Sequence, residues 1–248
     1  MPSAKIADIP PATLAALNAG TVAARNLVEG LAIDFRKLLA AVAPSLPASA
    51  IDSLDPKLGI TRRMALAARL LLDHGDEKAI ASLLGSPSDT VRGWAAYVVG
   101  LTPKLTLKQR LARIKPLAAD PHFGVREWAW LAVRPHVAAE VAAAVKILTP
   151  WSADPSPLVR RFASEVTRPR GVWCGHINEL KASPELGLPV LEPLKADPEK
   201  YVQDSVANWL NDAAKTSPAW VRDLCRRWQR ESDAPATRRI CKRAARSL

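Results

Sequence analysis

One short template occurs four times in this chain and constrains its fold more than any other feature. The template is Asp or Ser followed by Pro, then three residues, then Val, then Arg or Gln. Its copies begin at Ser86, Asp120, Asp154 and Asp197, and a fainter copy begins at Asp55. An Asp or Ser side chain accepts hydrogen bonds from free backbone N–H groups, and Pro suits the first helical position. Each copy therefore predicts the start of a helix.

The spacing of these starts predicts the architecture. From Asp55 onward, successive copies lie 31, 34, 34 and 43 residues apart, which leaves room for a second helix in each interval. Self-similarity at this period is typical of stacked helical pairs. No segment shows clear two-residue alternation, so we predict an all-α chain. We expect one domain over 1–248, with N-terminal helices in 1–50, repeats in 51–248 and basic capping helices in 217–248.

The charge of the chain predicts a polyanionic partner. Its 248 residues carry a formal net charge of +11, and nucleic acid is the commonest partner for such a chain. The alternative is a soluble basic protein without such a partner. The C-terminal segment is especially basic and fits phosphate contact through Arg238, Arg239, Lys242 and Arg243, although a solvated capping helix would have the same pattern.

Aligning the repeats on their Val places acidic, amide and arginine side chains in register, one and two helical turns further on. Equivalent positions of stacked repeats lie side by side, so these residues are predicted to line one concave groove. They are Glu127, Arg161, Glu165, Arg168, Asp204, Asn208, Asn211 and Asp212. Carboxylates in a basic groove have two interpretations. In the first, they are catalytic and stabilise an oxocarbenium-like transition state or orient a water. In the second, they form ion-pair ladders between repeats, with Glu165 paired to Arg161 and Arg168.

Three arginines, Arg92, Arg126 and Arg160, recur at one template position. We predict that they pair with neighbouring acids and hold the repeats together.

The aromatic residues fall into two groups. One group shares the apolar column and is predicted to be core: Trp94, Trp128 and Phe162. The other group falls off that face and is predicted to stack on a base or sugar: Trp130, Trp151 and Trp173. Trp173 follows Pro169 and Gly171, which are expected to end a helix and open a long loop, and long loops in repeat scaffolds tend to carry function.

Several site classes find no support in the sequence. The three cysteines form no CxxC pair, and the four histidines lack metal-ligand spacing, so we expect no metal. No phosphate-cradling glycine loop is present, and we expect no cofactor. The first thirty residues lack signal-peptide features, and no run of eighteen apolar residues occurs. We therefore expect a cytoplasmic protein that does not contact a membrane.

Two long motifs resemble a known family. Residues 159–170, VRRFASEVTRPR, closely resemble the VRRxASExTRPR signature of AlkC-like DNA alkylation-repair proteins. Residues 201–212, YVQDSVANWLND, are similar to that family's YVxxSVANxLND block, and the match continues through residues 217–228. The resemblance covers residues 85–245 and has both motifs in the expected order.

This resemblance implies a HEAT-like-repeat DNA glycosylase, similar to AlkC and more distantly to AlkD. Its fold would be a right-handed superhelical α-solenoid of helical pairs. Such enzymes remove cationic N-alkylated bases, such as 3-methyladenine, from double-stranded DNA without a metal or cofactor. The implied acidic pair is Glu127 and Glu165, with Asp212 or Asp204 as the next candidate. The DNA contacts would come from Arg161, Arg168, Arg170, Trp173, Asn208, Asn211, Lys215 and the C-terminal basic run. The resemblance also implies a monomeric, nucleoid-associated bacterial protein.

Two other functions remain open at this stage. A non-catalytic module for damaged or branched DNA would use the same groove. A HEAT-like protein-interaction scaffold would fit the repeats but not the basic groove.

Overall fold

The computed structural model describes residues 5–75 and 77–248, and within these ranges it contains helices and no strand. The expected all-helical fold is confirmed. Met1–Ala4, part of the predicted N-terminal segment, and Asp76 lie outside the described residues. No helix in the described part is long and apolar enough to cross a membrane.

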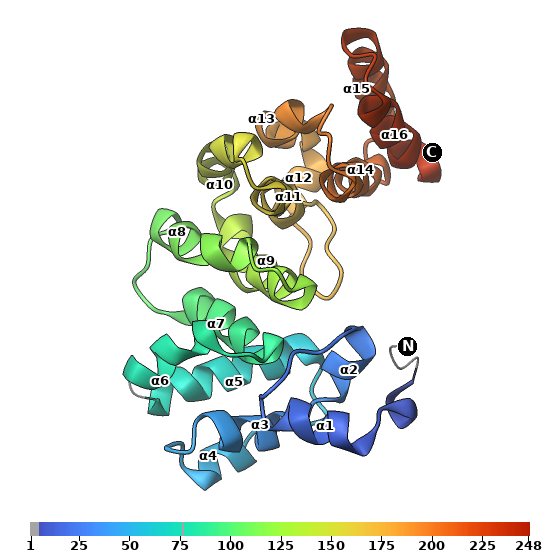
Figure 1. Ribbon diagram of the computed structural model, residues 1–248. Helices are drawn as coiled ribbons and strands as arrows, with labels where there is room; N and C mark the ends of the chain where they lie inside the picture. The colour runs from blue at the N-terminus through green and yellow to red at the C-terminus, as the bar shows by residue number, and fades with distance from the viewer. Residues whose placement is uncertain (1–4, 76) are drawn as a thin grey trace. The chain divides into compact units, whose positions relative to one another are not determined.

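The chain divides into two compact units (Figure 1). The first comprises Met1–Leu105 and Asp120–Ala132. Its α-helices before the shared helix are α1 (Pro11–Asn18), α2 (Leu27–Ala32), α3 (Phe35–Val42), α4 (Ala48–Asp52), α5 (Ile60–His74), α6 (Glu77–Ser82) and α7 (Asp89–Leu101). The shared helix, α9 (Phe123–Ala139), begins in this unit and ends in the second.

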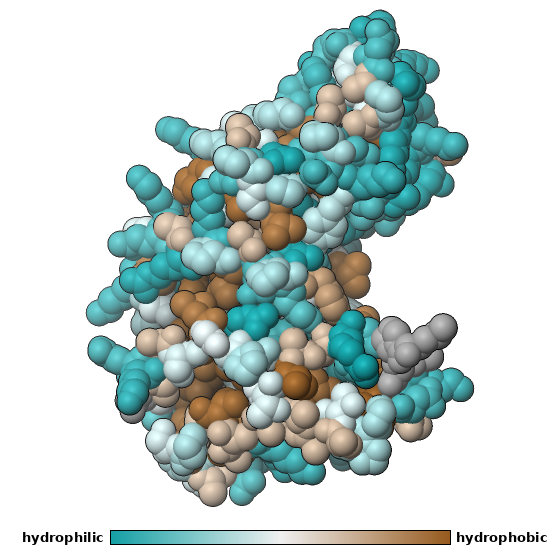
Figure 2. Space-filling view, viewed as in Figure 1, coloured by the Kyte–Doolittle hydropathy of each residue, from teal (hydrophilic) through white to brown (hydrophobic). Residues whose placement is uncertain are grey.

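The second unit comprises Thr106–Ala119 and Val133–Leu248. Its other α-helices are α8 (Leu107–Ala118), α10 (Val141–Leu148), α11 (Pro157–Val166), α12 (Asn178–Ala182), α13 (Leu188–Leu191), α14 (Lys200–Ala214), α15 (Pro218–Glu231) and α16 (Pro235–Ala244). Helix α14 packs against α11, α15 and α16. The surface over α15 and α16 is mostly hydrophilic (Figure 2).

The template predicts where helices begin but not how its residues act there. Helices α7, α9, α11 and α14 each begin three residues after the template's first position. The aspartates do not cap the helices directly. Asp120, Asp154 and Asp197 instead accept the backbone N–H two residues further on, at 2.7, 2.9 and 2.9 Å. These are Asx-turns, and the template Pro lies in the turn. The prediction that this Pro occupies the first helical position is therefore wrong.

Each template arginine folds back onto its own turn. The Arg92 guanidinium donates to the carbonyls of Ser86 and Pro87, at 2.7 and 3.2 Å. Arg126 and Arg160 each repeat this pair of bonds with the carbonyls six and five residues earlier, and Gln203 does so through its side-chain amide. The side chain at this one template position therefore closes the turn in all four clear copies, as arginine in three and as glutamine in the fourth.

Two of these arginines also reach the next copy of the template. Arg92 binds both carboxylate oxygens of Asp120, at 2.8 and 3.2 Å. Arg160 binds both carboxylate oxygens of Asp197, at 2.6 and 3.1 Å. The prediction that Arg92 and Arg160 hold repeats together through neighbouring acids is confirmed. We call this arrangement of turn, arginine and next aspartate the repeat clamp.

The predictions for the aromatic residues are correct for the core group and partly wrong for the stacking group. The expected core residues Trp94, Trp128 and Phe162 are buried. The expected stacking residues Trp130 and Trp151 are buried as well, so that prediction is wrong for both. Trp130 donates its indole N–H to Glu127 at 2.8 Å, and the Trp151 ring packs 5.5 Å from that of Phe162. Trp173 is 50% exposed and remains available.

We predict that replacing Arg160 by Met lowers the free energy of unfolding by about 3 kcal/mol. The Asp197 side chain is only 4% exposed, and it would keep its charge without its partner. Urea denaturation at pH 7 measures the change. Arg226→Met is the matched control, because the Arg226–Asp223 pair is fully on the surface and should contribute less than about 1 kcal/mol. Equal losses in both variants would contradict the importance of the clamp.

Candidate active site

Glu165 lies on the last turn of α11, at the centre of the charged residues that the sequence predicts. It is 4% exposed. One oxygen, Oε1, accepts from Arg168 Nη1 at 2.7 Å, and the other, Oε2, accepts from Ser205 Oγ at 2.6 Å. The Arg161 guanidinium is 3.6 Å from Oε2. The predicted pairing of Glu165 with both arginines is confirmed.

The local sequence explains this arrangement. Arg161 and Glu165 lie one turn apart on α11, so their side chains meet. The helix ends at Val166, three residues before Pro169, as predicted. Because the chain leaves the helix there, Arg168 turns back towards Glu165.

The surroundings of Glu165 keep it ionised. Burial alone would raise its pKa, but Arg161, Arg168 and the Ser205 hydroxyl hold the pKa below the ordinary glutamate value. Glu165 is therefore a fixed negative charge within the second unit.

Arg168 also binds a second carboxylate, that of Asp212 on α14. Its Nε and Nη2 atoms lie 2.9 and 2.8 Å from Asp212 Oδ2. Lys215 Nζ lies 3.7 Å from Oδ1. Burial raises the pKa of Asp212, and Arg168 offsets this only in part. Two carboxylates from successive repeats thus share one arginine, and their environments move their pKa values in opposite directions. We call Glu165, Arg168 and Asp212 the carboxylate cluster.

A buried arginine that was not predicted as a site residue supports this cluster. Arg134 is 2% exposed and donates to the carbonyls of Val166, Arg168 and Gly175, at 3.0, 2.7 and 3.1 Å. These bonds fix both ends of the loop that follows α11. Arg134 occupies the same aligned position as Arg168 one repeat earlier. That register was the signal that could have identified it. Ser205, which lies inside the second motif, was likewise missed.

The loop after α11 exposes an apolar pair, Val172 and Trp173. Trp173 has a φ of 62°, in the left-handed region that bulky residues rarely adopt. Such backbone strain persists only where the surrounding structure enforces it, and it concentrates at functional sites. Arg170, from the same loop, donates to the Asp212 carbonyl at 3.3 Å. The loop is therefore joined to the carboxylate cluster at both Arg168 and Arg170.

The remaining predicted residues of α14 face α16 and the segment after it. Asp204 Oδ1 accepts from Arg239 and Arg243, at 2.7 and 3.1 Å. Asn208 accepts from Arg246 at 2.8 Å. The buried Asn211 donates to the Ala244 carbonyl at 3.0 Å. These contacts fasten the C-terminal helix to α14 and form a second group, apart from the carboxylate cluster.

Three further predicted residues lie away from the carboxylate cluster in their contacts. Glu127 lies on α9 in the first unit and accepts from the Trp130 indole. Arg238 donates to the Asp233 carbonyl, and Lys242 is exposed. Over the described residues, no group of three or more His, Cys, Asp or Glu side chains is arranged to hold a metal ion.

Comparison with known families identifies the class of protein. The model of the family described as DNA alkylation repair enzyme matches residues 85–246, which include the repeat clamps and the carboxylate cluster. The chain belongs to this family, as its two motifs predicted.

Individual relatives agree with this assignment. YhaZ, an uncharacterized protein of Bacillus subtilis strain 168, is 38% identical over 135 residues, which are 54% of this chain and 36% of YhaZ. The alkylpurine DNA glycosylase AlkC of Pseudomonas fluorescens, solved with DNA containing an abasic site analog, is 29% identical with a TM-score of 0.70. That match covers 86% of this chain and 61% of AlkC. The chain thus spans about a third of YhaZ and under two thirds of AlkC.

A more distant structure supports the fold alone. AlkD2 of Streptococcus mutans is 22% identical with a TM-score of 0.63, over 79% of this chain and 94% of AlkD2.

We predict opposite effects on stability for the two carboxylates. Glu165 has a lowered folded pKa, so its contribution is present above the ordinary glutamate pKa of about 4.3 and is lost as pH falls through the folded value. Asp212 has a raised folded pKa, so its ionisation at neutral pH costs stability. This cost begins to fall as pH drops through the folded value and is gone below the ordinary aspartate pKa of about 3.9. At pH 7, Glu165→Gln should therefore lower the free energy of unfolding by roughly 3 kcal/mol, whereas Asp212→Asn should leave it unchanged or raise it.

Urea denaturation of both variants and the native protein at pH 7 and pH 5 measures these effects. A loss in Asp212→Asn as large as that in Glu165→Gln would show that both carboxylates are equally structural.

Proposed function

We propose that this protein is a DNA glycosylase that excises cationic N-alkylated bases, such as 3-methyladenine, from double-stranded DNA. Its membership of the DNA alkylation repair enzyme family supports the reaction class. Its likeness to AlkC, which was solved bound to DNA containing an abasic site analog, supports DNA as the partner. The observation that carries the proposal is the carboxylate cluster, in which Arg168 joins Glu165 to Asp212.

The chemistry requires little beyond well-placed negative charge. When the N-glycosidic bond of a cationic base breaks, its electron pair neutralises the base, and positive charge develops on the sugar. Water then adds to C1′ and loses a proton. A carboxylate close to C1′ stabilises the developing positive charge and positions the water. In this proposal no metal or cofactor takes part.

The two carboxylates of the cluster are suited to different roles. Glu165 has both oxygens occupied by hydrogen bonds and is a permanent anion, which suits it to holding Arg168 and Asp212 in place. Asp212 Oδ1 lies 3.7 Å from Lys215 Nζ, beyond hydrogen-bond distance, and burial raises the pKa of Asp212. We assign Asp212 the contact with the reacting sugar and Glu165 the positioning of Asp212 through Arg168. Glu127 remains the predicted acidic residue of the first unit.

The proposed DNA contacts lie around and beyond this cluster. Trp173 offers an exposed aromatic ring for stacking, and Arg170 and Lys215 lie beside Asp212. Exposed basic residues of α15 and α16, Arg222, Arg230, Arg238 and Lys242 among them, would bind the phosphates. We assign Arg239 and Arg243, which already pair with Asp204, mainly to holding α16 against α14.

One observation favours a second function, non-catalytic binding of damaged or branched DNA. Glu165 is almost inaccessible, and its charge is fully compensated by its neighbours, which is the arrangement of a structural ion pair. A binding protein would keep the same basic surface and the exposed Trp173 without any excision.

We predict that Asp212→Asn and Glu165→Gln each lower the rate of base release at least about 100-fold. Asp212→Asn removes charge that acts in the transition state, and Glu165→Gln releases the Arg168 that positions Asp212. The assay is release of labelled 3-methyladenine from alkylated duplex DNA, with DNA binding measured in parallel. Glu185→Gln, on an exposed carboxylate outside the cluster, is the control and should keep the native rate. No release by the native protein above spontaneous loss, across a panel of alkylated bases, would favour the binding function.

We predict that basic residues on the α15–α16 surface contact DNA phosphates, so that replacing them weakens the salt dependence of DNA affinity. Replacing Arg222 and Lys242 by Gln should reduce the slope of log affinity against log salt by about 0.9 for each phosphate contact removed. Fluorescence anisotropy with duplex DNA at several salt concentrations measures this slope. Lys108→Gln, on α8, is the control. An unchanged slope in the double variant would place the phosphate contacts elsewhere.

A further inference from the structure

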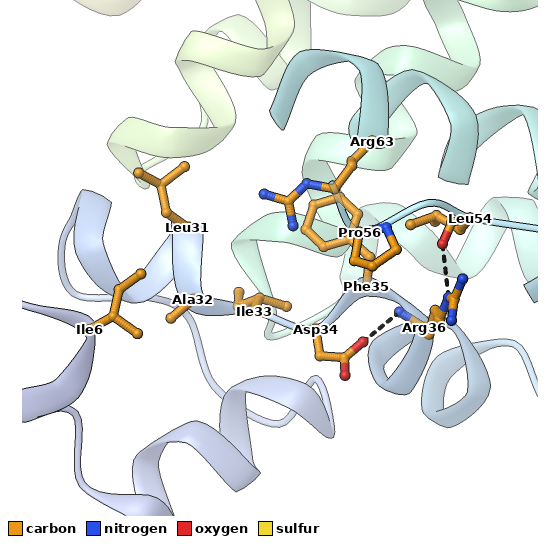
Figure 3. A pocket seen from close by; sticks show the side chains of 10 residues that line it. All are labelled: Ile6, Leu31, Ala32, Ile33, Asp34, Phe35, Arg36, Leu54, Pro56 and Arg63. Atoms are coloured by element: carbon orange, nitrogen blue, oxygen red, sulfur yellow. Dashed lines mark hydrogen bonds between the residues drawn. The ribbon is translucent and has the colours of Figure 1, made fainter. Parts of the chain in front are cut away.

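The first unit contains a pocket of about 350 Å³ to which the glycosylase proposal gives no role (Figure 3). It lies where the segment after α2, the start of α3, the segment after α4 and the first turn of α5 come together. Most of its lining residues are apolar, Leu31, Ile33, Phe35, Leu54 and Pro56 among them, while polar and apolar atoms contribute about equally to its exposed surface. A pocket of this size with apolar walls and a few polar groups is typical of small-molecule sites.

The guanidinium of Arg63 extends into this pocket (Figure 3). Its Cζ lies 5.0 Å from the centre of the Phe35 ring, so the cation is held over an aromatic face. Its Nε is buried and has no hydrogen-bond partner among the described residues. Burial lowers the pKa of Arg63, and Asp34 opposes this through its charge. A buried donor without an acceptor costs free energy that a bound acceptor would recover.

The other two charged residues of the pocket are already occupied by the backbone. Arg36 donates from Nε to the Leu54 carbonyl at 2.8 Å and from Nη2 to the Asp52 carbonyl at 2.7 Å. Asp34 caps α3 by accepting the backbone N–H groups of Arg36 and Lys37 through Oδ1, at 3.0 and 3.3 Å. Among the described residues that line the pocket, Arg63 supplies the buried side-chain donor that lacks a partner, its Nε.

These charges select the kind of ligand. Two arginines and one aspartate give the lining a net charge of +1. A single negative charge would balance it, whereas a phosphate dianion would be repelled by Asp34. A guanidinium also matches the planar geometry of a carboxylate.

We propose that this pocket binds a small organic carboxylate, with its anionic end on Arg63 and its apolar or aromatic body against Phe35, Ile33 and Leu54. The backbone phosphates of DNA fit this site less well, because most of the residues around Arg63 are apolar and Asp34 adds a negative charge beside them. The proposal does not depend on the glycosylase reaction.

The Arg63 Nε–H group itself provides the test. In the ¹⁵N-labelled full-length protein, its resonance is assigned by its disappearance in Arg63→Lys. Titration with benzoate and hexanoate should shift this resonance in a saturable manner, because the carboxylate becomes its hydrogen-bond acceptor. Benzyl alcohol, which has a similar body but no charge, should leave it unchanged.

The variants test the same contact by affinity. Arg63→Gln should weaken benzoate binding at least about tenfold, since a charge-assisted hydrogen bond is lost. Arg62→Gln, at the exposed neighbouring position on α5, should bind as the native protein does. Absence of a saturable shift with either carboxylate would overturn the proposal. So would a shift produced by inorganic phosphate or duplex DNA but by neither carboxylate.

Discussion

The fold depends on one side chain that closes a turn and joins the next. In the repeat clamp, Arg92 and Arg160 each bind two carbonyls of their own turn and both oxygens of the following template aspartate. Arginine suits this task because its planar fork carries five donors. A lysine could not make the bidentate contact and the two carbonyl bonds together. The aspartate is equally committed, since Asp197 also accepts the N–H that shapes its own turn. Turn geometry and the spacing of repeats are therefore set by the same pair.

The clamp between Arg160 and Asp197 has a consequence for the candidate site. It fixes the starts of α11 and α14, which pack against each other. Further along these helices, Glu165 and Ser205 meet across the interface, and then Arg168 and Asp212. The carboxylate cluster is thus built from residues of α11 and α14. The Arg160–Asp197 clamp sets the separation of these two helices two to three turns before the cluster. Arg134 and the indole N–H of Trp209, which donates to the Thr167 carbonyl, fix the chain where α11 ends.

The parts of this arrangement that follow from local spacing could be predicted from the sequence. The starts of α7, α9, α11 and α14 and the pairing of Glu165 with Arg161 and Arg168 depend on residues within two turns of one another. The partnership of Arg168 with Asp212 spans 44 residues, and alignment of repeats placed them only on a common surface. Trp130 and Trp151 were misplaced because a helix in a stack is covered on more than one side. A single apolar stripe therefore underestimates its buried face. Asp204, Asn208 and Asn211 aligned with the site, but their partners come from α16 and the segment after it, whose position no template copy indicates.

The cluster also shows how a carboxylate whose ionisation costs stability is held between two repeats. Burial raises the pKa of Asp212 by more than Arg168 and Lys215 lower it, and the charge of Glu165 adds to the rise. Ionised Asp212 therefore costs stability, which is the usual property of a functional group and not of a structural one. Glu165 has the opposite character, since Arg161, Arg168 and the Ser205 hydroxyl together outweigh its burial and favour its charged form. If both carboxylates served only to join repeats, the raised pKa of Asp212 would have no compensating benefit. The cluster thus separates a structural carboxylate, Glu165, from a carboxylate whose ionisation costs stability, Asp212, and this difference supports the proposal that Asp212 faces the reacting sugar.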